Sequence, residues 1–315
     1  MSRYSEQPLS FDGLKTVPLE ARGGKVRIEH FARPFQKGAG VAGLLESLPR
    51  LLAGDGLRGV IEALRRAREK KRAILWGLGG HVIKCGLGDV LLDLARRGWV
   101  SGFVMNGAAS IHDFEIAIAG ATSEDVEAVL PDGRFGVAEE TGREMNRAVA
   151  VRDIGMGEAL GARLQSLARA EFAGHSILHQ AYAASIPVTV EVAIGTDTPH
   201  VHPSADGAAI GAASYRDFRL LCALLRGLDQ GGVYLNLGSA VVLPEVFLKA
   251  VSVVRNLGFP LAEFTTVNFD FLQHYRAKVN VVERPHARSG GRGYAITGHH
   301  ELMVPLLAAA LVELD

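Results

Sequence analysis

The chain alternates short runs that are apolar at every position with longer segments in which apolar residues recur at helical spacing. The clearest apolar runs are residues 73–76, 102–105, 187–194 and 233–237, and a fifth covers residues 263–267. Continuous apolar character is typical of strands buried on both faces, as in a parallel sheet. The pattern therefore predicts a mostly parallel sheet with its strands in the middle of the molecule.

Helical patterns lie between these runs. They cover residues 82–98, 157–174, 214–229 and 243–258, and residues 299–314 form a closing helix with Pro305 in its first two turns. Strands that alternate with helices favour an α/β fold, with a doubly wound sheet and helices on both faces.

The first 70 residues have a different pattern. Two helical patterns, at about 41–53 and 56–70, accompany only one strand-like run, at residues 25–31. We therefore expect residues 1–70 to form an N-terminal helical extension packed on the core or on a partner subunit, and residues 71–315 to form the α/β domain.

Charge and cysteine content narrow the function classes. Lysine plus arginine and aspartate plus glutamate number 34 each, so no net field favours nucleic acid or an anionic membrane. No apolar stretch is long enough for a membrane span, and the N-terminus lacks the apolar segment of a signal peptide. The two cysteines, Cys85 and Cys222, form no paired motif, which is typical of a reducing compartment. We expect a cytoplasmic protein.

Candidate chemistry lies in the loops that follow the predicted strands, because open parallel sheets bind ligands beyond the carboxyl ends of their strands. Each of these loops opens with glycine or asparagine: 77–84, 106–115, 195–211, 236–245 and 268–276. The segments "GLGGH" (77–81) and "NLGSA" (236–240) precede helices, whose free N–H groups bind phosphate or carboxylate. The alternative is a glycine-rich turn without a ligand.

Two histidine-rich segments are further candidates. His200 and His202 lie two apart, so in an extended segment both imidazoles point to one side and could share a metal with Asp197, His299 or His300. The alternative is a polar loop that bonds substrate or a neighbouring subunit. His299, His300 and Glu301 open the last helix, where the dipole favours a neutral histidine suited to act as a base or as a cap.

Several segments together resemble the deoxyhypusine synthase family, in particular its bacterial deoxyhypusine synthase-like branch. They are residues 77–115, 176–197, 236–251, 264–270 and 294–311, in the same order and spacing. The resemblance implies a Rossmann-like sheet that binds NAD at the strand ends, in a homotetramer with sites near a dimer interface. It also implies a small-molecule substrate, oxidised at an amine whose alkyl group then passes through an imine on a lysine.

The resemblance places a set of residues where the family's loops touch NAD or substrate. They are Gly77, Gly79, His81, Gly86, Asn106, Gly107, Ala108, Asp113, Asp197, Gly207, Gly238, Ser239, Thr266, Asn268 and Asp270.

The departures from the family concern the transfer chemistry. No lysine lies between Val279 and the C-terminus, and the nearest upstream, Lys278, is several residues from the family's position. Glu245 follows proline where the family has a histidine pair, and Arg276 and Lys278 replace an acidic stretch that holds the polyamine. Since an imine relay needs a buried amine, and basic groups repel a polycation, we expect retained NAD binding and a changed substrate.

Three hypotheses remain. In the first, an NAD-dependent enzyme transfers hydride, with amine-group transfer left open, to or from a small amine or amino-acid-like substrate. Asp113 or Asp197 then binds a ribose or an amine, and His299, His300 or Glu245, with Glu301 alongside, does acid–base work. The second is a metal-dependent enzyme that uses His200 and His202 with His299 or His300, and the third is a non-catalytic ligand-binding homologue.

Overall fold

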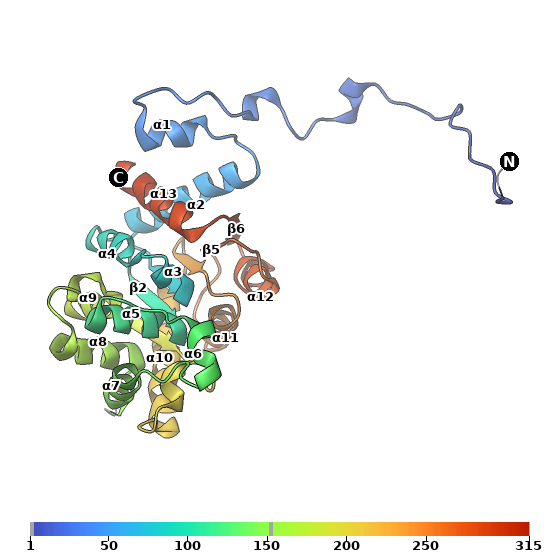
Figure 1. The fold of residues 1–315 in the computed structure, drawn as a ribbon. Coiled ribbons are helices and arrows are strands. Elements are labelled where there is room, and N and C mark those ends of the chain that lie inside the picture. The colour runs from blue at the N-terminus through green and yellow to red at the C-terminus, as the bar shows by residue number, and fades with distance from the viewer. Residues whose placement is uncertain (1–2, 151–153, 315) are drawn as a thin grey trace.

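The computed structural model describes residues 3–150 and 154–314 of the chain (Figure 1). Its centre is a sheet of six parallel strands in the order β3-β2-β1-β4-β5-β6. The strands are β1 (Ile74–Leu78), β2 (Gly102–Asn106), β3 (Val188–Glu191), β4 (Val233–Leu237), β5 (Thr265–Asp270) and β6 (Arg292–Thr297). The predicted fold class is confirmed: this is an α/β, Rossmann-like, doubly wound sheet.

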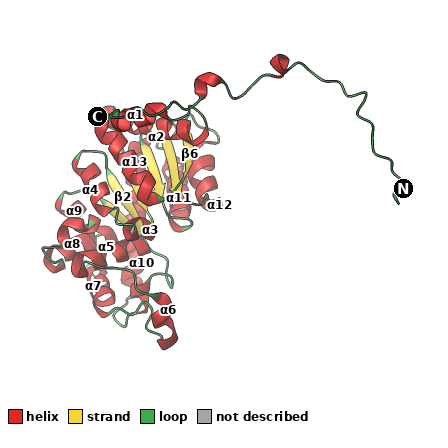
Figure 2. Cartoon of the chain, turned by 45° about the horizontal axis from the view of Figure 1, so that its top comes forward, coloured by secondary structure: helices red, strands yellow, loops and turns green. Residues whose placement is uncertain are grey.

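Helices cover both faces of the sheet, and Figure 2 shows the strands enclosed between them. The longer ones are α2 (Leu52–Glu69), α5 (Gly107–Ala119), α7 (Glu139–Val149), α8 (Met156–Leu167), α10 (Gly207–Leu225), α11 (Val242–Asn256) and α13 (His300–Glu313). The shorter ones are α1 (Gly40–Ser47), α3 (Gly80–Lys84), α4 (Gly88–Arg96), α6 (Val126–Val129), α9 (Ile177–Ala183) and α12 (Tyr275–Ala277).

The core is divided into two clusters by the sheet. Trp76 of β1 packs into one cluster with α2, α5, α8 and α13, whereas its neighbour Leu75 packs into the other with α11 and the end of α10. Successive residues of a strand point to opposite faces, so the two clusters lie on opposite sides. Burial on both faces explains the continuous apolar runs in the sequence.

Several element boundaries differ from the sequence-based prediction. The helix predicted over residues 82–98 is two helices, because Gly86 has a φ of +74° and ends α3 before α4 begins. The strand predicted over 187–194 stops at Glu191. The edge strand β6 has half-exposed positions and no continuous apolar run, so the resemblance alone indicated it.

The N-terminal segment before α1 runs away from the body of the molecule (Figure 1). The strand predicted at residues 25–31 is wrong, since this stretch holds only a 3-10 turn at Ile28–His30. α1 contacts α13, and α2 packs on the sheet as part of the main core. The domain boundary at residue 70 stays a prediction.

Within residues 3–150 and 154–314, no helix combines the length and the apolar character needed to cross a bilayer.

Candidate functional site

The glycine loops that follow β1 and β4 touch at the carboxyl end of the sheet. A side chain at Gly79 would place its Cβ 2.1 Å from the carbonyl oxygen of Gly238, so only glycine allows this approach. Gly238 itself has a φ of +65°, which also favours glycine. The chain runs outward in one direction from β1 to β3 and returns at β4, so this contact marks the switch point of the sheet.

The loop after β2 joins the same edge. A Cβ at Gly80 would lie 2.9 Å from the Cβ of Ala108, and one at Gly107 would lie 2.0 Å from Oδ2 of Asp197. The Asn106 side chain accepts a hydrogen bond from the N–H of Ala109 at 2.9 Å and caps α5. Loops far apart in the sequence therefore form one rim, as the parallel sheet predicts.

A crevice of about 530 Å³ lies beside this rim, against α5. Its walls include Lys84, His112, Glu115, Asp197 and Phe135. Burial raises the pKa of Asp197 and lowers that of His112. The crevice thus combines an apolar wall with one lysine, one neutral imidazole and three carboxyl groups, a combination that suits a small polar ligand.

Three histidines gather on the other side of the β1 loop. The ring of His81 lies 5.5 Å from that of His300, centroid to centroid, and 5.8 Å from that of Phe271. His299 stacks on Phe271 at 6.1 Å. Phe271 follows β5, and His299 and His300 follow β6, so the loops after β1, β5 and β6 meet here. The Phe271 side chain is exposed.

His300 is buried within this histidine group. Its Nε2 donates to the carbonyl oxygen of Phe269 at 3.0 Å, and its Nδ1 is buried without a hydrogen-bond partner among the described residues. Burial lowers the pKa of His300, so the ring is neutral and Nδ1 offers a free lone pair. His299, by contrast, is exposed at the helix N-cap.

Four residues from the sequence analysis hold the rim together through their side chains or backbone. Asn236 donates to Asn268 Oδ1 at 2.7 Å and to the carbonyl oxygen of Ser239 at 2.9 Å. Ser239 Oγ accepts from the N–H of Leu243 at 3.2 Å, and Asp270 Oδ1 from that of Phe271 at 2.8 Å. These bonds fix the loops, and the N–H groups of Gly79 and Gly238 themselves donate to the carbonyl oxygens of Leu237 and Phe269, at 2.8 and 3.2 Å.

Asp113 lies away from the rim. Its fully buried carboxylate accepts hydrogen bonds from Ser176 Oγ at 2.7 Å and from the N–H groups of Ile177 and Leu178 at 2.7 and 2.8 Å. Burial raises its pKa to about 6. Asp113 therefore caps the N-terminus of α9, and both oxygens of its carboxylate accept hydrogen bonds.

This cap gives a prediction. Asp113→Ala is expected to lower the unfolding free energy by about 2 kcal/mol, because three donors lose their acceptor, as measured by urea unfolding. Asp206→Ala, which removes the exposed cap of α10, should cost about 1 kcal/mol. A variant at Asp113 that keeps its stability but loses nucleotide affinity would contradict the capping role and favour the role that the resemblance implies.

Glu245 is also committed to local pairs. It accepts from Arg276 at 3.0 Å and from Asn280 at 2.9 Å, and it pairs with Lys249. These partners hold the pKa of Glu245 below its usual range, and the hydrogen bond from Lys249 has the largest effect. A carboxylate kept ionised by cations is poorly suited to act as an acid, and Arg276 is not a free cation at the site. Lys278 points to Glu283, with 3.8 Å between Nζ and Oε1.

The alternative of a metal shared by His200 and His202 assumed an extended segment, which the structure does not show. His200 lies in a 3-10 turn, Thr198–Val201, and not in an extended segment. His202 bonds Ser204 at 2.7 Å and Glu139 at 3.1 Å. Within residues 3–150 and 154–314, the side chains close enough together to hold a metal ion are His81, Cys85 and Glu301, so neither of these histidines is among them.

Gly86 and Gly207 stand apart from the rim contacts. A Cβ at either would meet no atom within 4 Å, and Gly207 begins α10 behind its Asp206 cap.

The sequence analysis placed Lys84 and Phe271 in candidate loops without giving either a role, and it missed Cys85. Cys85 lies four residues after His81, a spacing that puts two side chains on one helix face, and this was the signal available. No local pattern singles out Lys84 or Phe271.

No protein-family profile matches the chain, and no curated protein sequence does. Solved structures do match. An LOR/SDH protein from Methanococcus maripaludis S2 is similar over 84% of this chain and 71% of its own, at 15% identity and a TM-score of 0.53. AgrE, solved in a ternary complex with ornithine and NAD⁺, is similar over 82% of this chain at 18% identity and a TM-score of 0.52.

A third structure, a protein assigned as a deoxyhypusine synthase from Entamoeba histolytica, matches over 90% of this chain and 96% of its own, at 13% identity and a TM-score of 0.50. The chain spans only 33% of the AgrE chain. At these identities the matches establish the fold. The resemblance to the deoxyhypusine synthase family therefore holds for the fold, which this chain shares with a protein solved with NAD⁺.

Proposed function

We propose that this chain is an enzyme that binds NAD across the ends of β1 and β4 and transfers hydride to or from a small amine or amino-acid-like substrate. The observation that supports this most is the contact between Gly79 and Gly238 at the switch point of the sheet. Dinucleotides bind at such points in doubly wound folds, where glycine lets the backbone approach the pyrophosphate.

The residues present fit this cofactor. Gly79, Gly80 and Gly238 let the loops of the rim pack closely against their neighbours, and the 530 Å³ crevice beside α5 has room for one end of the ligand. The nicotinamide supplies the redox chemistry when bound, while the protein orients it and its substrate. The ornithine and NAD⁺ bound to AgrE support an amino acid as one substrate class.

His300 is the residue that we assign to the substrate side. Its buried Nδ1 has no hydrogen-bond partner among the described residues, and a lone pair of this kind can accept a proton or a hydrogen bond from an ammonium or hydroxyl group. An imine on the family's lysine is not part of this proposal, because no lysine lies between Val279 and the C-terminus.

The test has two readouts. NAD added to the purified chain is expected to raise the unfolding temperature in a saturable way, with stabilisation of about 2.7 kcal/mol at a hundredfold excess over Kd. A panel of diamines and basic amino acids is then screened for NADH formation by absorbance. Absence of any stabilisation by millimolar NAD would contradict the proposal, and binding without turnover would leave the non-catalytic alternative.

A further inference from the structure

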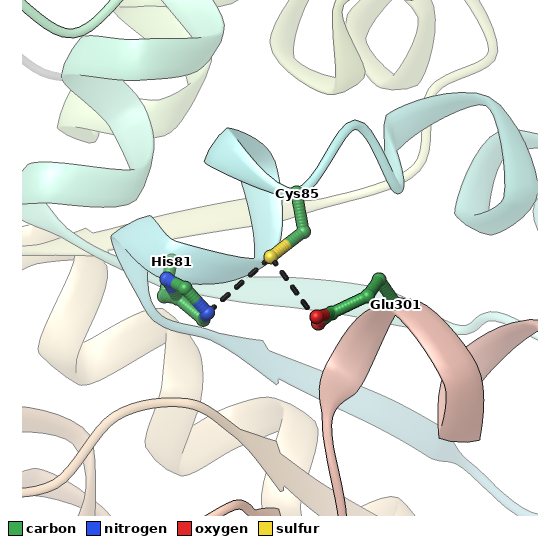
Figure 3. Close-up of side chains that lie close together, drawn as sticks. All are labelled: His81, Cys85 and Glu301. Atoms are coloured by element: carbon green, nitrogen blue, oxygen red, sulfur yellow. Dashed lines mark hydrogen bonds between the residues drawn. The ribbon is translucent and has the colours of Figure 1, made fainter.

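His81, Cys85 and Glu301 point toward one another at the rim (Figure 3). His81 and Cys85 come from α3 and the residue after it, and Glu301 comes from the first turn of α13, 216 positions further along the chain. Their donor atoms all lie within 4.8 Å of one another. We propose that these three side chains form a zinc-binding site.

The distances match a tetrahedral zinc centre. With Zn–S near 2.3 Å and Zn–N or Zn–O near 2.0 Å, neighbouring ligand atoms lie roughly 3.5 Å apart. His81 Nε2 is 3.3 Å from Cys85 Sγ, and Cys85 Sγ is 3.7 Å from Glu301 Oε2. His81 and Glu301 are exposed and Cys85 is half-buried, so an ion can enter with small movements of these side chains.

The donor set also matches zinc. A thiolate and an imidazole are ligands that zinc prefers over magnesium or calcium, and a carboxylate completes many zinc sites. One thiolate and one carboxylate balance the two charges of Zn²⁺. Three protein ligands leave a fourth position for water or for a donor atom of a small molecule, which is the arrangement of reactive zinc sites.

Neighbouring side chains help to hold the three proposed ligands in position. His299 Nδ1 lies 3.7 Å from Glu301 Oε1, close enough to orient the carboxylate once the metal is bound. Phe271 and His300 pack against the His81 ring and limit its movement. The bound ion would link the loop after β1 to the start of α13. The site uses no nucleotide and does not rest on the proposed function.

The test uses the full chain, freed of metal with a chelator and reconstituted with Zn²⁺ or Co²⁺ in the absence of NAD. We expect one zinc per chain by elemental analysis after desalting, and a thiolate-to-cobalt charge-transfer band with Co²⁺. Cys85→Ala should lose both, and Glu301→Gln should bind at least about tenfold more weakly. Circular dichroism of the metal-free variants checks that they fold.

Two matched variants make the result specific. Cys222→Ala removes the other cysteine, which is buried near α11, and should keep the zinc and the cobalt band. His202→Ala should keep them as well. The proposal is overturned if the reconstituted wild-type chain retains no zinc, if Cys85→Ala retains it, or if His202→Ala loses it. None of these outcomes bears on NAD binding.

Discussion

Replacing Glu191 by glutamine is expected to stabilise the protein at alkaline pH by up to about 4 kcal/mol of unfolding free energy. Glu191 ends β3 and is 4% exposed, with Oε1 lacking any hydrogen-bond partner in the part of the chain that the structure describes. Burial, and then the charge of Asp217, raise the pKa of Glu191 to about 8. The ionised form is therefore costly in the folded chain.

The sign follows from proton counting. Between pH 4.5, the ordinary pKa, and about 8, the folded chain holds a proton on Glu191 that the unfolded chain has lost. Raising the pH through this window therefore destabilises the wild type, by about 2.7 kcal/mol from about pH 6 to about pH 9. Asp217, whose pKa burial raises to about 7, adds to the same trend.

Urea unfolding at these two pH values measures the effect. Glu191→Gln should flatten the pH dependence, since a neutral amide does not titrate. The control is Glu144→Gln, the same chemical change at a buried carboxylate whose pKa is lowered to about 2, by Arg143 first and also by Arg163. That variant should be less stable than the wild type near neutral pH. Equal pH dependence in the Glu191 variant and the wild type would refute the explanation.

Gly79→Ala is expected to weaken NAD binding at least about tenfold, which corresponds to about 1.4 kcal/mol. The new methyl group would lie 2.1 Å from the carbonyl oxygen of Gly238 and 2.9 Å from the N–H nitrogen of Ser239. The two loops must then separate, which moves the backbone groups proposed to hold the pyrophosphate. Forced overpacking of this kind also costs about 1–3 kcal/mol of stability.

Calorimetric titration with NAD measures the affinity, after thermal unfolding has shown that the variant is folded. Gly211→Ala is the matched control, because a Cβ at this position of α10 meets no atom within 4 Å. It should bind NAD as the wild type does. If Gly79→Ala folds and binds NAD normally, the contact between the β1 and β4 loops plays no part in the site.

The sheet was predictable because burial on both faces leaves a continuous apolar run, which a single sequence displays directly. The interruption at Gly86 was harder to predict, because apolar residues keep their helical spacing on both sides of it and only the backbone angle changes. β6 escaped the pattern because an edge strand is apolar at fewer positions. Only the resemblance, over residues 294–311, indicated a closing strand there.

The candidate site was predictable to the level of its loops and not to the level of its side chains. Strand ends in a parallel sheet must meet at one edge, so the gathering of the loops at one rim followed from the fold class. Asp113 shows the limit, since nothing in the sequence tells a carboxylate that binds a ligand from one that caps α9. Cys85 and Glu301 meet only through tertiary packing.

The most direct measurement for the central claim is a crystal structure of the full chain grown with NAD. The account predicts nucleotide density along the rim, with the pyrophosphate against Gly79, Gly80 and Gly238 and one end in the crevice beside α5. Density for NAD at another surface, with this rim empty at saturating NAD, would contradict it.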